Sequence, residues 1–154
     1  MRKLSKIKDL TIDVGIVMMG CRIGNPDSGG RCRSLMDKVK GASSWYLALD
    51  QGGKIRHQYE VKLRHSTYWL KWMTELGRRG KLRFFKWTKI DKGTITQLKE
   101  QHFDWEDFKY VRTAWLTECG ILVASTPCYS PEIRRILRKR LSVFVRQPIA
   151  CLDL

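Results

Sequence analysis

The chain has 154 residues, the usual size of one domain, which leaves no room for a second core of comparable size. Its 30 lysines and arginines against 15 acidic residues give a formal net charge of +15, and 43% of the residues are hydrophobic. This composition excludes a disordered basic tail and indicates a folded domain whose partner is a polyanion. We favour nucleic acid as that polyanion; an acidic protein and, more weakly, a membrane surface are the alternatives.

No run of 18 apolar residues is present, and the basic residues 1–10 are not followed by the apolar segment of a secretory signal. The five cysteines are an odd number, and their spacing is typical of neither a zinc site nor a disulfide framework. We therefore expect reduced thiols and a cytoplasmic protein without a membrane-spanning segment.

The first third of the chain alternates apolar runs with turn-forming segments. The apolar and β-branched run Leu10–Met19 predicts a buried strand that contains one carboxylate, Asp13. Turn-forming residues predict a loop over 20–30, and a short helix is predicted over 31–40. A second buried strand is predicted over 45–49, where it ends at an Asp-Gln-Gly-Gly turn.

Helical periodicity dominates the middle of the chain. Helices are predicted over 55–63 and 66–78; in the second, tryptophans and other apolar residues recur at helical spacing, which favours a core role. Residues 82–87 are interpreted as a strand or an extended arm, and a short helix is predicted within 91–100.

The last third returns to alternating helices and strands. A helix over 104–118 is predicted to begin at Asp104 as its N-cap, followed by a strand over 121–124, a helix over 131–140 and a strand over 141–145. This order predicts a three-layer α/β fold, with a mostly parallel central sheet and helices on both faces. We expect one domain that spans residues 1–154.

Three carboxylates are candidates for a shared site, because a parallel sheet binds ligands beyond the carboxyl ends of its strands. They are Asp13 in the first strand, Glu60 in the helix 55–63, and Asp107 in the first turn of the helix 104–118. Three such oxygen donors suit Mg²⁺ or Mn²⁺. The alternatives are a cap at the end of a strand for Asp13, a solvated position for Glu60 and a helix-dipole partner for Asp107.

Three segments resemble the PIN-domain family, which consists of small metal-dependent nucleases with a parallel sheet. The first is the strand Ile12-Asp13-Val14. The second is the strand, turn and helix from Leu47 to Glu60. The third is the helix start Asp104–Val111, which is followed by the strand Ile121–Ala124.

The resemblance implies that Asp13, Glu60 and Asp107 are catalytic residues that hold Mg²⁺ or Mn²⁺, with Asp104 as a further metal ligand. The family commonly has another aspartate after the strand 121–124, where this chain has Ser125-Thr126. A weaker site, a single metal ion or an inactive member are the alternatives that this departure leaves open.

Two basic segments are candidates for contact with nucleic acid, since cations hold phosphates and aromatic rings stack on bases. In the first, aromatic residues are interleaved with the cations, and Trp87 is a candidate stacking residue, with packing in the core as the alternative. In the second, on the helix 131–140, a solvated face is the alternative. The candidates are Lys81, Arg83, Lys86 and Trp87 in the first segment, and Arg134, Arg135 and Arg138 in the second.

The sequence thus predicts a divalent-metal-dependent endonuclease, with RNA favoured over DNA because a flexible single strand suits a basic and aromatic surface. A second hypothesis is a catalytically weakened PIN-like module that binds nucleic acid or a partner protein within a larger assembly. A third is a structural subunit whose charge an acidic companion neutralises. A homo-oligomer is also left open.

Overall fold

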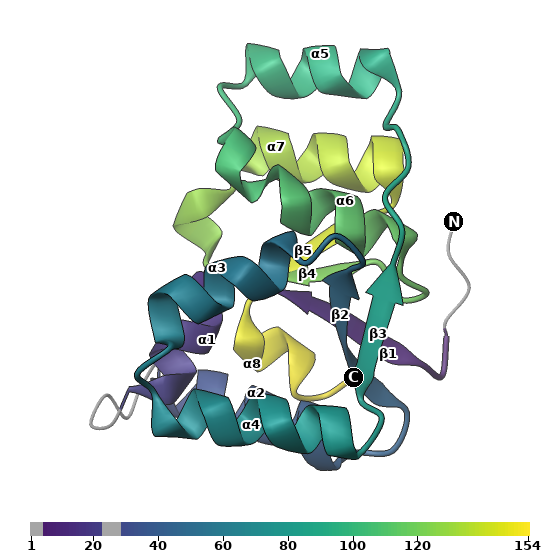
Figure 1. Ribbon diagram of the computed structural model, residues 1–154. Coiled ribbons are helices and arrows are strands. Elements are labelled where there is room, and N and C mark those ends of the chain that lie inside the picture. Colours follow the sequence, from purple (N-terminus) through teal and green to yellow (C-terminus); the bar gives the residue numbers. More distant parts are fainter. Residues whose placement is uncertain (1–4, 23–28) are drawn as a thin grey trace.

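The structure is a computed structural model that describes residues 5–22 and 29–154, except for the side chains of Gly29 and Thr126. A five-stranded parallel sheet with the order β3-β2-β1-β4-β5 forms its centre (Figure 1). The predicted three-layer α/β fold is therefore confirmed, with all strands parallel. The strands are β1 (Lys8–Ile12), β2 (Trp45–Asp50), β3 (Leu82–Phe85), β4 (Ile121–Val123) and β5 (Phe144–Arg146).

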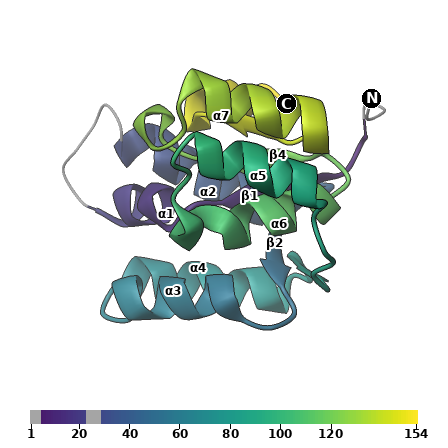
Figure 2. The same ribbon diagram turned by 90° about the horizontal axis from the view of Figure 1, so that it is seen from above.

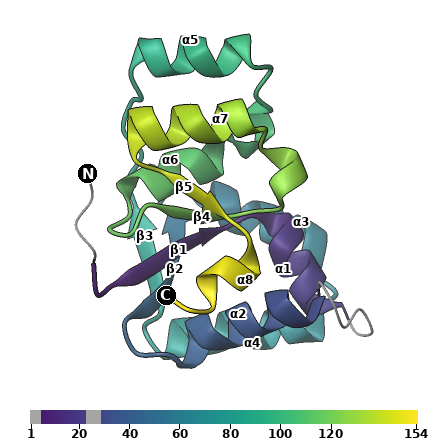
Figure 3. The same cartoon turned by 180° about the vertical axis from the view of Figure 1, so that it is seen from behind.

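Helices cover both faces of the sheet (Figures 1 and 3). Helix α6, with α5 and α7 beyond it, covers one face, while α2, α4 and α8 cover the other; α1 and α3 lie beside the carboxyl ends of β1 and β2. Seen from above in Figure 2, α3 and α4 lie on the same flank of the molecule. The helices are α1 (Val14–Cys21), α2 (Gly29–Gly41), α3 (Lys54–Leu63), α4 (Thr67–Arg78), α5 (Lys92–Glu100), α6 (Phe108–Leu116), α7 (Pro131–Ile136) and α8 (Pro148–Cys151).

The predicted strand over Leu10–Met19 is wrong in its second half. Strand β1 ends at Ile12, Asp13 serves as the N-cap, and the apolar residues that follow form helix α1. A short apolar run fits a buried strand and a buried helix equally well, because periodicity cannot separate the two. The N-cap favours the helix here, because the Asp13 Oδ1 accepts a hydrogen bond from the Gly15 amide at 2.7 Å.

The predicted strand over 141–145 is shifted toward the C-terminus. After α7 the chain continues in a wider π turn, Leu137–Leu141, and leaves it at Ser142, whose φ of 52° is left-handed. Strand β5 therefore starts only at Phe144. The following short helix α8 was not predicted.

One hydrophobic core unites the two helical layers with the sheet. The tryptophans of α4 belong to it, as their helical spacing predicts: Trp69 and Trp72 are buried, and the Trp72 Nε1 donates to the Met36 carbonyl at 2.8 Å. Within residues 5–22 and 29–154, no helix is both long and apolar enough to cross a membrane.

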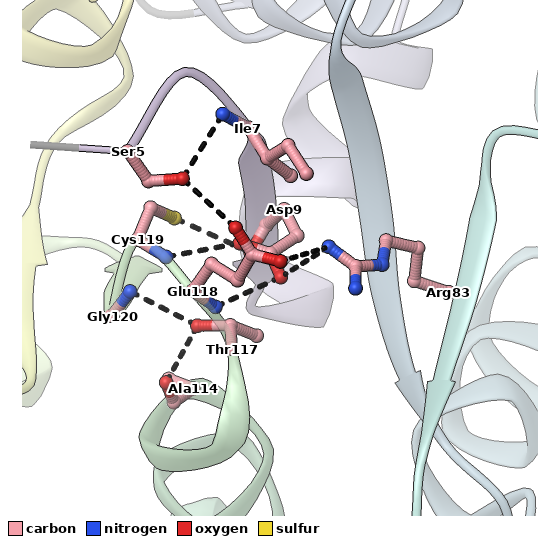
Figure 4. A network of polar contacts seen from close by, with 9 residues as sticks. All are labelled: Ser5, Ile7, Asp9, Arg83, Ala114, Thr117, Glu118, Cys119 and Gly120. Carbon is pink, nitrogen blue, oxygen red and sulfur yellow. Dashed lines mark hydrogen bonds and ion pairs between the residues drawn. The ribbon is translucent and has the colours of Figure 1, made fainter.

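A buried carboxylate ties the amino end of the sheet together (Figure 4). Asp9 of β1 is fully buried; it accepts hydrogen bonds from the Glu118 and Cys119 amides at 2.9 and 3.0 Å and pairs with the Arg83 Nη1 at 3.1 Å. Glu118 also lies 3.6 Å from that guanidinium. The network joins β1, β3 and the turn before β4, and a buried charge that is paired in this way is structural.

Candidate functional site

The candidate site lies where the strand order of the sheet reverses. The chain passes from β1 to its neighbour β2 on one side and returns to β4 on the other, and such switch points bind ligands beyond the strand ends. Asp13 is the first residue after β1, and its amide donates to the Val123 carbonyl at the end of β4, at 2.9 Å. The backbone therefore holds Asp13 at the mouth of this crevice.

The carboxylate of Asp13 is only partly satisfied by protein donors. One oxygen caps α1 through the Gly15 amide; the other accepts no hydrogen bond from the described residues. Burial raises the pKa of Asp13, and the Gly15 hydrogen bond and the charge of Lys109 oppose that rise. A carboxylate in this state has an oxygen available to a ligand.

Asp107 faces the same place from the other side of the crevice. It ends the 3-10 turn η1 (Trp105–Asp107), whose N-cap Asp104 accepts from the Glu106 amide at 3.0 Å. The predicted helix 104–118 thus begins as a 3-10 turn and becomes α6 only at Phe108. Burial raises the pKa of Asp107 to about 6, and the negative charges of Asp13 and Asp104 add to that rise. The cluster of Asp13, Asp104 and Asp107 therefore holds excess negative charge.

A buried hydroxyl next to this acidic cluster has no partner. Tyr129 is fully buried, and its hydroxyl makes no hydrogen bond with the described residues. Burial raises the pKa of Tyr129, and the charges of Asp107 and Asp13 raise it further. Buried polar groups normally have partners, so this hydroxyl keeps an unused hydrogen-bonding capacity beside the charges of Asp107 and Asp13.

Two buried tyrosines hold the elements beside the acidic cluster in place. Tyr110 of α6 accepts from the Val14 amide at 3.2 Å and donates to the Gln58 Oε1, while Tyr59 of α3 donates to the Ile12 carbonyl. These bonds join α3 and α6 to the end of β1. The negative charge of Asp13 raises the pKa of both hydroxyls in addition to burial.

The structure does not bring Glu60 to the acidic cluster. Glu60 lies on the exposed side of α3, where it pairs with the Arg56 Nε at 3.4 Å. The buried face of α3 is formed by Ile55, Tyr59 and Leu63, and the polar residue of α3 that reaches the cluster is Gln58. The i, i+4 spacing of that apolar face is the sequence signal that turns Glu60 outward.

The remaining donors define what the acidic cluster can hold. Among the described residues, no group of three or more His, Cys, Asp or Glu side chains is arranged to hold a metal ion. Mg²⁺ nevertheless needs only one or two carboxylates when waters and substrate phosphates complete its coordination, so Asp13 and Asp107 fit it. Ser125 follows β4 and is exposed; the side chain of Thr126 lies outside the described part of the chain.

Comparison with known proteins adds no assignment. The chain matches no protein-family model, no curated protein and no solved structure. The residues themselves must carry the functional interpretation.

A groove of about 600 Å³ runs alongside the acidic cluster, between α3, η1 and α6. Three lining residues connect the groove to the cluster: Gln58, Glu106 and Lys109. Gln58 accepts a hydrogen bond from Tyr110, while the charge of Glu106 raises the pKa of Asp107 and that of Lys109 lowers it. Its other lining residues include the aromatic side chains Trp87, Trp105 and Phe108 and the cations Lys54, Lys62 and Arg112.

The aromatic residues of the groove are partly held in place by their neighbours. The Trp87 Nε1 donates to the Thr113 Oγ1 at 2.9 Å, and the Arg112 guanidinium lies 4.4 Å from the centre of the Trp87 ring. Trp105 is 40% exposed and meets Phe108 edge to face, with ring centres 5.0 Å apart. Trp105 therefore offers a supported, accessible ring to a base.

The predicted basic contacts separate into three groups. The Lys81 Nζ donates to the Trp45 carbonyl at 3.2 Å, and Arg83 pairs with Asp9. Both cations therefore stabilise the amino end of the sheet and do not belong to the proposed interface. Lys86 is exposed, but it does not line the groove, whereas Trp87 does. Arg134, Arg135 and Arg138 surround a separate hollow beside β5.

Proposed function

We propose that the chain is a divalent-cation-dependent nuclease that cuts single-stranded nucleic acid, RNA in preference to DNA, at the acidic cluster. The observation that carries this proposal is that Asp13 and Asp107 lie close enough at the switch point of the sheet for the charge of Asp13 to raise the pKa of Asp107, while neither carboxylate forms an ion pair with another described residue. The adjoining basic and aromatic groove supports a single strand as the substrate. The resemblance of the three sequence segments to PIN domains agrees with this proposal, and we propose a cytoplasmic setting for it.

Within this proposal Asp13 and Asp107 hold Mg²⁺ or Mn²⁺, with Asp104 at the margin of the site. A cation bound there supplies a more acidic water and stabilises negative charge on the phosphate. Lys109 moderates the repulsion between the carboxylates. Phosphates contact the cations of the groove, and Trp105 stacks on a base, which directs the strand past the cluster.

A second candidate function is binding of nucleic acid without cleavage. The observation that favours it is the outward position of Glu60, which leaves the described residues without a set of three metal-ligating side chains. In that case the groove retains its role, and the acidic cluster is too poor in ligands to support hydrolysis.

Labelled single-stranded RNA and DNA, each incubated with Mg²⁺, Mn²⁺ or EDTA, distinguish these functions. We expect cleavage with either cation and none in EDTA. Asp13→Asn should slow cleavage at least about 100-fold, the size of effect that follows loss of one group stabilising a transition state. The matched control Glu60→Gln should cleave as fast as the parent protein.

Two other outcomes are informative. Tight binding of RNA without cleavage in either cation would replace the nuclease with the binding module. Cleavage that survives Asp13→Asn but is lost in Glu60→Gln would move the reaction away from the proposed cluster.

A further inference from the structure

A second basic hollow lies at the far edge of the sheet, between α7 and the edge strand β5. Its volume is about 290 Å³, and it shares no lining residue with the groove beside the acidic cluster. Strand β5 supplies Phe144 and Arg146, and helix α7 with the turn that follows supplies Arg134, Arg135 and Arg138. We call it the arginine hollow.

Three of the four guanidinium groups in the arginine hollow have no acidic partner among the residues that the structure describes. Arg135 pairs with Glu132 at 2.7 Å, but no carboxylate of the described residues lies within 4.0 Å of Arg134, Arg138 or Arg146. The Arg134 Nε is buried and makes no hydrogen bond within the described residues. Like charges gathered in this way repel each other unless an anion joins them.

Other arginines of the chain show that pairing is available to this sequence. Glu75 binds both Arg78 and Arg79, at 2.8 and 3.1 Å, and Asp91 binds Arg140, two positions after Arg138, at 2.8 Å. Exposed arginines such as Arg64 also lack a carboxylate partner within the described residues, so what distinguishes the hollow is that its unpaired guanidiniums gather in one concavity and that the Arg134 Nε is buried. A buried donor without a partner is costly, which is a reason to expect a ligand at this place.

We propose that the arginine hollow is a second phosphate-binding site, which holds the backbone of a nucleic acid outside the groove. The planar guanidinium fork matches the oxygens of a phosphate, and several forks in one hollow suit a repeating phosphodiester chain. The half-buried Phe144 ring, 6.0 Å from the Arg146 guanidinium, adds an apolar wall. An acidic peptide strand added to β5 fits less well, because β5 has only three residues to pair with it.

This inference rests on the proposed function only in taking nucleic acid as the ligand, so its test measures binding alone. The double variant Arg138→Gln/Arg146→Gln removes two charges that, within residues 5–22 and 29–154, form no hydrogen bond or ion pair with another side chain. The matched control, Lys99→Gln/Arg64→Gln, removes two exposed charges that lie outside the hollow. Affinity for a single-stranded RNA of about 20 nucleotides is measured in EDTA across a series of salt concentrations.

We expect the hollow variant to bind about tenfold more weakly at 0.1 M salt, with the slope of log affinity against log salt reduced by about 1.4, or 0.7 for each lost contact. The control should change affinity less than about threefold and leave the slope unchanged. Equal losses in both variants would reduce the hollow to a contribution to general charge. Unchanged RNA binding with lost binding of a poly-glutamate peptide would assign the hollow to an acidic protein.

The cleavage assay separates this inference from the proposed nuclease. A protein that binds RNA through the hollow but does not cut it would keep the second site and refute the nuclease. A protein that cuts RNA while the hollow variant binds it normally would do the reverse.

Discussion

Two aspartates at opposite ends of β1 show what protein contacts do to a buried carboxylate. Asp9 is fully buried and is satisfied by two backbone amides and Arg83. Asp13 lies just past the other end of the strand and is partly buried. It accepts a hydrogen bond from one backbone amide, and its charge acts on the nearby Asp107. Both residues lie in or directly after the same strand, and they differ in the partners that their carboxylates find there.

The two ends of β1 thus have different roles: the amino end stabilises the sheet, and the carboxyl end is the candidate functional site. The partners of Asp9 lock the amino end of the sheet, and nothing remains for a ligand to satisfy. The carboxylates at the carboxyl end repel each other, and a fold tolerates such a cost where a bound molecule relieves it. The following variants test whether that contrast holds.

The largest effect is expected at Asp9. Asp9→Ala leaves the Glu118 and Cys119 amides and the Arg83 guanidinium without their acceptor, which should lower the free energy of unfolding by about 3 kcal/mol. Asp13→Asn should lower it by less than about 1 kcal/mol, because the amide oxygen still accepts from Gly15. Urea denaturation of both variants gives the comparison.

Glu118→Gln is the control for Asp9→Ala. The Glu118 carboxylate is 47% exposed and lies 3.6 Å from Arg83, so removing its charge should change the free energy of unfolding by less than about 1 kcal/mol. Equal urea midpoints for Asp9→Ala and the parent protein would show that the buried network does not hold the sheet.

A smaller effect is expected from the pH dependence of stability at Asp107. Its pKa is about 6 in the folded protein against an ordinary 3.8, so between these values the folded protein keeps a proton that the unfolded chain has lost. The free energy of unfolding should therefore fall as the pH rises from about 4 to 6. Asp107→Asn removes this decrease, so the free energy of unfolding at pH 7 should rise by about 1 kcal/mol once solvent screening is allowed for.

Urea denaturation at pH 4.5 and pH 7, in EDTA, measures this difference. Asp153→Asn, at an exposed position near the C-terminus, should keep the pH profile of the parent protein. If Asp107→Asn also keeps that profile, burial and the charges of Asp13 and Asp104 do not raise the pKa of Asp107.

The sequence was sufficient to predict the architecture, because the alternation of apolar strands and amphipathic helices is a local signal. It also selected Asp13 and Asp107 as candidates for one site, and in the structure the charge of Asp13 raises the pKa of Asp107. It could not assign the role of Asp9, whose partners lie about 74 and 110 residues away. It also misjudged Glu60, because the adjacent Tyr59 occupies the buried face of α3.

The last prediction, and the smallest effect, concerns Gln58, the residue of α3 that reaches the acidic cluster. Its Oε1 accepts from the Tyr110 hydroxyl, whose pKa the charge of Asp13 raises, and a glutamate there would keep that acceptor while adding a negative charge at the same hydroxyl. Because cation affinity rises with the number and charge of oxygen ligands, Gln58→Glu should tighten Mn²⁺ binding by about threefold to tenfold. Calorimetric titration with Mn²⁺, without nucleic acid, measures this change.

Glu60→Gln is the matched variant for this test, since it removes a carboxylate two positions further along the same helix, on its exposed side. We expect it to leave Mn²⁺ affinity unchanged, because Glu60 pairs with Arg56 on the outer side of α3. If Glu60→Gln weakens Mn²⁺ binding while Gln58→Glu has no effect, Glu60 is a ligand after all, and α3 must rotate when the cation binds. If neither variant alters the affinity, α3 contributes nothing to the cation site, and Asp13 and Asp107 must hold the ion without it.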